Sequence, residues 1–164
     1  MNITVFLADD HAIVRDGLRA LLEAQSDIRV VGEAATGREA LRRLKELSAS
    51  VVIDVAIVDI AMPEMNGIDL TREIVAALPS TAVVILSMYS TAEHVSRAFL
   101  AGARAFLAKE SAGTEVVDAV RAVHAGGRYV SERLSKSAAR APAFDRAASQ
   151  PIPPARPSDQ ERRT

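Results

Sequence analysis

Short apolar runs alternate with amphipathic segments of helical length over the first 130 residues, and this alternation limits the possible folds more than any other feature of the chain. A repeat of this kind predicts a parallel β-sheet with helices covering both of its faces. The five expected strands are Ile3 to Ala8, Arg29 to Ala34, Asp54 to Asp59, Ala82 to Ser87 and Arg104 to Ala108. The five expected helices are Ala12 to Gln25, Gly37 to Leu47, Gly67 to Leu78, Ala92 to Ala101 and Gly113 to Ala125. The sequence therefore predicts an α/β domain built on a five-stranded, doubly wound parallel sheet.

Two stretches fall outside this alternation. Residues Ser48 to Ile53 leave one boundary open, because Val51-Val52-Ile53 can begin the third strand or belong to a longer loop. The alternation ends near residue 130, and five of the seven prolines lie between Pro142 and Pro157 among Ala, Ser and Arg. Such a composition cannot bury a core, so we expect a linker over residues 131–164, with one helix over 132–140.

Composition excludes several classes of function. The chain of 164 residues has no cysteine, which excludes disulfides, thiolate metal sites and thiol catalysis and favours the cytoplasm. No apolar run approaches the roughly 18 residues of a membrane span, and there is no secretory signal pattern. The net charge of -1 lacks the basic excess of a nucleic-acid-binding domain, so we expect any DNA contact to come from another segment.

Acidic side chains follow two of the predicted strands. Asp9 and Asp10 come directly after the first strand, and Asp59 closes the third. The carboxyl ends of parallel strands meet at one edge of a sheet, so these three carboxylates can converge around a hard cation. The alternative is that Asp9 and Asp10 only cap the first helix.

Four motifs, each at the end of a predicted strand, resemble the receiver domain of bacterial two-component response regulators over roughly residues 1–130. They are Leu7-Ala8-Asp9-Asp10-His11, the segment Val58 to Gly67 with Asp59 and Met62-Pro63, Leu86-Ser87, and Ala105-Phe106-Leu107-Ala108-Lys109. Asp-Asp-His and the later Gly-Gly-Arg-Tyr-Val are similar to the NarL/LuxR-type subfamily. The resemblance implies a flavodoxin-like fold and a helix-turn-helix DNA-binding domain after the receiver. That domain would begin near Ser158, where a Ser-x-x-Glu pattern typical of a helix start stands at the end of this chain; a frayed polar terminus is the alternative.

The resemblance also implies a phosphorylation site. Asp59 would be the phosphoacceptor, and Lys109 would pair with it before the reaction and with a phosphoryl oxygen afterwards. Mg²⁺ is the expected cofactor, bound by Asp10, Asp59, the backbone carbonyl of Ala61 and, through water, Asp9. If Lys109 were an ordinary exposed residue at a strand end, this assignment would fail.

Two further residues would carry the switch. By the resemblance, Ser87 donates a hydrogen bond to a phosphoryl oxygen, and an aromatic side chain at the position of Phe106 then moves from exposed to buried. Because Phe106 has no phenolic hydroxyl, any role of such a hydroxyl is lost. We also expect Asn66 to cap the helix that Gly67 opens. Taken alone, Ser87 and Phe106 would be assigned structural roles.

The histidines give no comparable signal. His11, His94 and His124 could act as phospho-relay groups or metal ligands, but their spacing forms no cluster, so we expect surface or capping roles.

The expected function is that of a phosphorylation-switched signalling domain of a transcription regulator, not an enzyme. Its partners would be a sensor histidine kinase and a second copy of the chain, with DNA bound only through the missing domain and no membrane contact. One rival is a pseudo-receiver that docks without phosphate. The other is a haloacid-dehalogenase-type hydrolase, which would carry a second acid two residues after its nucleophile, where this chain has Ala61.

Overall fold

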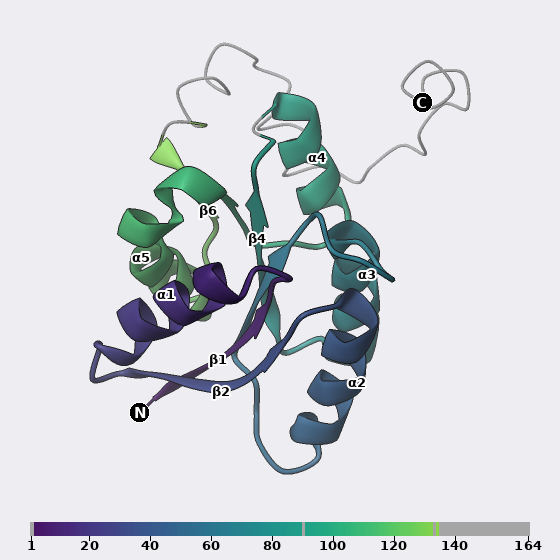
Figure 1. Cartoon of the computed structure of the whole chain (residues 1–164), viewed down its shortest axis with the longest axis vertical. Coiled ribbons are helices and arrows are strands. Elements are labelled where there is room, and N and C mark those ends of the chain that lie inside the picture. The colour runs from purple at the N-terminus through teal and green to yellow at the C-terminus, as the bar shows by residue number, and fades with distance from the viewer. Residues whose placement is uncertain (1, 90, 133, 135–164) are drawn as a thin grey trace.

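A six-stranded parallel sheet forms the centre of the computed structural model, which describes residues 2–89, 91–132 and 134 (Figure 1). The strands lie in the order β2-β1-β3-β4-β5-β6, and each neighbouring pair is parallel. They are β1 (Ile3–Ala8), β2 (Ile28–Ala34), β3 (Val55–Asp59), β4 (Ala82–Ser87), β5 (Ala105–Ala108) and β6 (Tyr129–Val130). The carboxyl ends of the strands therefore lie along one edge of the sheet.

Helices cover both faces of this sheet (Figure 1). They are α1 (Ala12–Glu23), α2 (Gly37–Ser48), α3 (Gly67–Ala77), α4 (Ala92–Leu100) and α5 (Ala112–His124), the last preceded by a 3₁₀ turn, η1 (Lys109–Ser111). Helices α1 and α5 pack on one face, and α2, α3 and α4 pack on the other.

Two apolar layers fill the space between the sheet and the helices. Alternate residues of β1 belong to different layers, because successive side chains of a strand point to opposite faces. Phe6 packs towards α2 and α3, while Val5 and Leu7 pack towards α1 and α5. All five residues of β3 are buried, which accounts for its uninterrupted apolar sequence.

The structure confirms the α/β class and all ten predicted elements, whose bounds agree within two residues. The expected number of strands was wrong, since β6 pairs with β5 and makes the sheet six-stranded. A two-residue strand is too short to produce an alternating pattern in the sequence. The ambiguous stretch after α2 is a loop, tied to β1 where the hydroxyl of Thr4 donates to the carbonyl of Val52 at 2.5 Å.

Packing continues past residue 130, because Ser131 and Leu134 are both buried. Apart from Glu132 and Leu134, the helix predicted over 132–140, the rest of the linker and the pattern at Ser158 lie outside the described residues. Within the part of the chain that the structure describes, we find no helix with the length and apolar composition needed to cross a bilayer.

Candidate phosphoacceptor and metal site

Three carboxylates meet at the carboxyl edge of the sheet. Asp9 and Asp10 follow β1, and Asp59 is the last residue of β3, the strand that pairs with β1. Asp9 and Asp59 are almost fully buried, whereas the side chain of Asp10 keeps about a third of its surface exposed. One ligand atom from each of Asp9, Asp10, Asp59 and His11 lies within 4.8 Å of the others. The convergence expected from the strand order is therefore present.

Lys109 reaches this cluster from the turn after β5. Its Nζ lies 2.9 Å from Asp59 Oδ2 and 3.1 Å from Asp9 Oδ2. Only a tenth of the Lys109 side chain is exposed, so one ammonium is shared by two buried carboxylates. Charge and burial together hold the Lys109 ammonium in place, so Lys109 is not an ordinary exposed residue at the end of a strand.

His11 belongs to the same cluster and also fits the surface or capping role expected for it, since it is the N-cap residue of α1 and more than half of its side chain is exposed. Its Nδ1 lies 3.0 Å from Lys109 Nζ, 3.1 Å from an oxygen of Asp10 and 3.2 Å from an oxygen of Asp9. The signal for this placement was its position directly after the acid pair. His94 also has the expected surface or capping role, since its ring stacks on Tyr89 and its backbone N–H is capped by Thr91.

Burial sets the protonation chemistry of the site. It raises the pKa of the Asp59 carboxyl above its ordinary value of 3.8, against the hydrogen bond from Lys109, and the charge of Asp9 raises it further. Burial lowers the pKa of Lys109, but its hydrogen bonds and charge interactions with Asp59 and Asp9 together outweigh this effect, so the net shift is upward from 10.5. The upward shift of the Lys109 pKa therefore contributes stability that is fully present below its ordinary value of 10.5 and is lost as the pH rises through the folded-state pKa of Lys109.

Ser87 lies at the same edge, at the end of β4. It is buried, and its hydroxyl donates to the carbonyl of Tyr89 and accepts from the backbone N–H of the same residue, each at 2.9 Å. Phe106, on β5, is fully buried in the core. Of the two positions that the resemblance implies for this aromatic, the structure shows the buried one.

The loop between β3 and α3 shapes the rim beside Asp59. The backbone N–H of Ala61 donates to Asp59 Oδ1 at 3.2 Å. As predicted, Asn66 caps α3, its side-chain oxygen accepting from the backbone N–H of Asp69 at 2.9 Å. Gly67 lies so close to β3 that a Cβ placed there would come within 2.4 Å of the Asp59 carbonyl oxygen. Glycine is required at position 67 because the backbone of α3 approaches the end of β3 so closely there.

We expect Gly67→Ala to lower the free energy of unfolding by about 1–3 kcal/mol, because the loop or the end of β3 must shift to admit the methyl group. Gly17→Ala is the matched control, since Gly17 is an exposed residue within α1 with nothing within 4 Å of a built Cβ. The control should gain up to about 1 kcal/mol from the better helix propensity of alanine. Urea denaturation of both variants checks this contrast, and equal effects would contradict it.

The donor set suits Mg²⁺. Carboxylate oxygens are the ligands this ion prefers, and it needs few of them because it keeps several waters. Asp9 Oδ2 is buried and, although close to the Lys109 ammonium, accepts a hydrogen bond from none of the described residues, which leaves a lone pair available. Asp9, Asp10 and Asp59 would hold the ion, and a cation there would offset the mutual repulsion of these carboxylates.

This site should lose Mg²⁺ at a higher pH than ordinary aspartates would. Mg²⁺ competes with a proton for Asp59, and the pKa of Asp59 lies above 3.8. In the metal-free protein a fall in pH has the opposite effect on folding stability. As the pH falls through the folded-state pKa of Asp59, protonation of this carboxylate stabilises the folded protein. Calorimetric Mg²⁺ titrations from neutral to acidic pH measure the effect. An affinity that stays constant until the pH nears 3.8 would contradict it.

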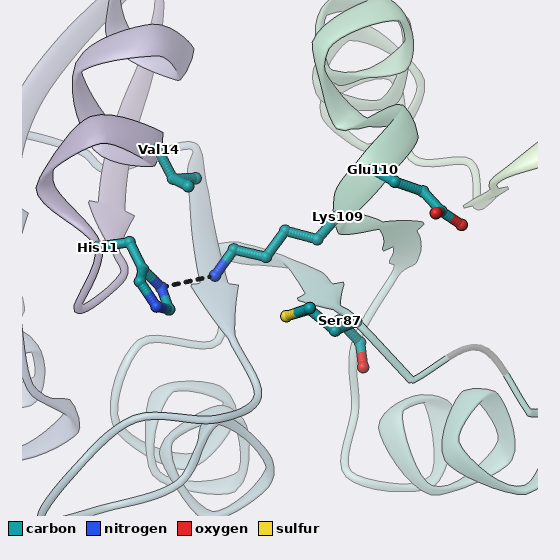
Figure 2. Close-up of a pocket in the computed structure, with 6 residues that line it drawn as sticks. His11, Val14, Ser87, Lys109 and Glu110 are labelled. Atoms are coloured by element: carbon teal, nitrogen blue, oxygen red, sulfur yellow. Dashed lines mark hydrogen bonds between the residues drawn. The ribbon is translucent and has the colours of Figure 1, made fainter.

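A cavity of about 340 Å³ opens beside Lys109. Figure 2 shows the Lys109 side chain extending across it to His11, with Ser87 on the β4 side. The cavity thus places the two groups expected to bind phosphoryl oxygens on the wall of one space. Asp59 is not among its lining residues, so the cavity adjoins the acid cluster through Lys109 and His11.

Comparison with known proteins agrees with this geometry. The sequence profile of the response regulator receiver domain matches residues 5–121. The chain belongs to the response regulator receiver family. The uncharacterized transcriptional regulatory protein YhcZ of Bacillus subtilis is 44% identical to this chain over 125 residues, which are 76% of this chain and 56% of YhcZ. The receiver chain therefore spans little more than half the length of that relative.

Solved structures show the same receiver fold. A LuxR-family response regulator from Aurantimonas sp. superposes with a TM-score of 0.80 and 32% identity over 87% of this chain and 99% of that one. The isolated receiver domain of RcsB from Salmonella enterica, in the presence of the phosphomimetic BeF₃⁻, gives a TM-score of 0.75 and 29% identity over 83% of this chain and 98% of that one. This receiver is therefore of the NarL/LuxR type found in two-component transcription regulators.

Proposed function

We propose that this receiver accepts a phosphoryl group on Asp59 from a sensor histidine kinase and thereby changes its binding partners. The observation that carries the proposal is the shared contact of Lys109 with Asp59 and Asp9 at the edge of the sheet, beside a cavity that Ser87 also lines. A buried nucleophile, a fixed cation and a hydroxyl are the parts that phosphoryl transfer to a carboxylate needs.

In the transfer step, an oxygen of ionised Asp59 forms a bond to phosphorus. The bond from phosphorus to the donor atom breaks, and that atom, a histidine nitrogen of the kinase or the acyl oxygen of a small acyl phosphate, keeps the electron pair. Lys109 passes from Asp59 Oδ2 to a phosphoryl oxygen. The hydroxyl of Ser87 leaves the Tyr89 carbonyl and donates to another phosphoryl oxygen, which draws the loop after β4 inward. Mg²⁺, when bound, supplies positive charge against the phosphoryl oxygens.

The output follows from stabilising one of two conformations. A shift from mostly inactive to mostly active takes roughly 5 kcal/mol of differential stabilisation, which a dianion with new bonds to Lys109 and Ser87 can provide. The proposed consequence is homodimerisation, with DNA binding through a helix-turn-helix domain that follows the receiver in the whole protein. The naming of YhcZ as a transcriptional regulatory protein supports this output.

Incubation with acetyl phosphate, followed by intact-mass measurement, tests the proposal. With Mg²⁺ present the protein should gain the mass of one phosphoryl group, and with excess EDTA it should gain none. No gain in either condition would favour a phosphorylation-independent docking module. Rapid, sustained release of inorganic phosphate would favour a hydrolase, for which the residue two after Asp59, Ala61, offers no second acid.

A further inference from the structure

The residue directly after β6, Ser131, touches the phosphoacceptor site through its buried side chain. Ser131 has no exposed surface, and its Oγ accepts a hydrogen bond from the backbone N–H of Ala108 at 2.9 Å. Ala108 is the last residue of β5 and directly precedes Lys109. The hydroxyl of Ser131, which follows β6, therefore holds the backbone of the residue directly before Lys109.

A second hydroxyl holds the other side of the same residue. Ser111 Oγ donates to the carbonyl oxygen of Ala108 at 3.2 Å and lies 3.4 Å from Ser131 Oγ. Across the sheet, Ala108 is the register partner of Ser87 on β4. Ala108 is thus fixed between the predicted switch serine on one side and Ser131 on the other.

Hydrogen bonds and apolar packing also hold the backbone around Ser131 in place. The backbone N–H of Ser131 donates to the carbonyl of Phe106 at 3.0 Å, and Tyr129 donates its hydroxyl to Glu115 on α5, also at 3.0 Å. Leu134 is buried in the same apolar cluster as Phe106. Ser131 therefore has little freedom to move away from Ala108.

Resting on the function proposed above, we infer that Ser131 is a positioning residue for Lys109. Its hydroxyl fixes the end of β5 so that the Lys109 ammonium stays between Asp9 and Asp59. Loss of the hydroxyl frees the Ala108 N–H and loosens the turn η1, and a small displacement of a long side chain is enough to weaken both contacts. It also makes the segment after α5 a part of the site, because Ser131 lies in that segment, directly after β6.

Two variants, one on β6 and one directly after it, separate this role from general support of the strand. Ser131→Ala removes the hydroxyl on Ala108 with little change in volume. Tyr129→Phe removes a hydrogen bond of the same strand to α5 and leaves Ala108 untouched. If Ser131 positions Lys109, Ser131→Ala slows phosphoryl uptake from acetyl phosphate by about ten- to a hundredfold, since a misplacement of about 1 Å can cost a hundredfold, while Tyr129→Phe changes uptake less than twofold. Ser131→Thr, which keeps the hydroxyl, should recover most of the rate.

A second readout does not depend on phosphorylation. In ¹⁵N-labelled protein at low temperature, the Lys109 ammonium should give a resolved NMR signal in the parent and in Tyr129→Phe, because two carboxylates shield its protons from exchange. In Ser131→Ala that signal should broaden or vanish. Equal behaviour of the two variants in both readouts would overturn the inference. A parent that shows the ammonium signal but takes up no phosphoryl group would refute the proposed function and leave this test of Ser131 intact.

Discussion

Asp59→Asn should abolish covalent phosphorylation, the largest effect expected of any substitution in this protein. The amide is nearly isosteric with the carboxylate but is not nucleophilic, so no bond to phosphorus can form. Lys109 would keep its contact with Asp9, 3.1 Å away, and the fold should be retained. Intact-mass measurement after incubation with acetyl phosphate and Mg²⁺ gives the result directly.

Asp118→Asn is the matched control for this change. Asp118 lies on α5 and is exposed, so the same loss of one carboxylate there should leave phosphoryl uptake unchanged. Uptake that persists in Asp59→Asn at the parent's rate would show that another side chain accepts the group. Loss of uptake in both variants would point to an effect of net charge and not of the nucleophile.

Lys109→Ala should produce the second largest effect, on stability as well as on phosphoryl transfer. The substitution leaves the carboxylates of Asp9 and Asp59 buried without their shared cation. Breaking a buried ion pair by removing one partner costs about 3–5 kcal/mol, and we expect about 3 kcal/mol because Asp59 can take up a proton. Transfer should slow by at least about a hundredfold, since an electrostatic contact with the phosphoryl group is lost.

Mg²⁺ provides the internal check on this explanation. A cation that binds among the carboxylates replaces part of the lost charge, so saturating Mg²⁺ should stabilise Lys109→Ala more than it stabilises the parent. Lys45→Ala, an exposed lysine on α2, should show neither the loss nor the larger Mg²⁺ effect. Urea denaturation with and without Mg²⁺ measures both. If Lys109→Ala is as stable as the parent without metal, the shared ion pair is not what holds the site.

The fold was predictable because each element has a strong local signal. The apolar run of β3 and the helical periodicity of α1 leave little choice of structure, and the parallel arrangement then brings strand ends together. That geometric rule, applied to Asp9, Asp10 and Asp59, was enough to place the three carboxylates in one cluster. The resemblance of motifs was needed to assign a role to Lys109.

Other features have no local signal. β6 is two residues long and exists because it pairs with the edge of β5, so it depends on tertiary contacts that no periodicity reports. The contact of His11 with Lys109 depends on the position of β5 beside the acid pair, which the sequence around His11 does not show. Ser131 follows an unremarkable Tyr-Val pair, and only the fold places its hydroxyl against Ala108.

The central claim is that the carboxylate of Asp59 accepts the phosphoryl group, and chemical trapping tests it most directly. Borohydride reduces an aspartyl phosphate to homoserine, whose position peptide mass spectrometry then locates. After incubation with acetyl phosphate and Mg²⁺, we predict homoserine at position 59 and at no other position. Homoserine at another aspartate, or none in a protein that is folded and binds Mg²⁺, would contradict the account.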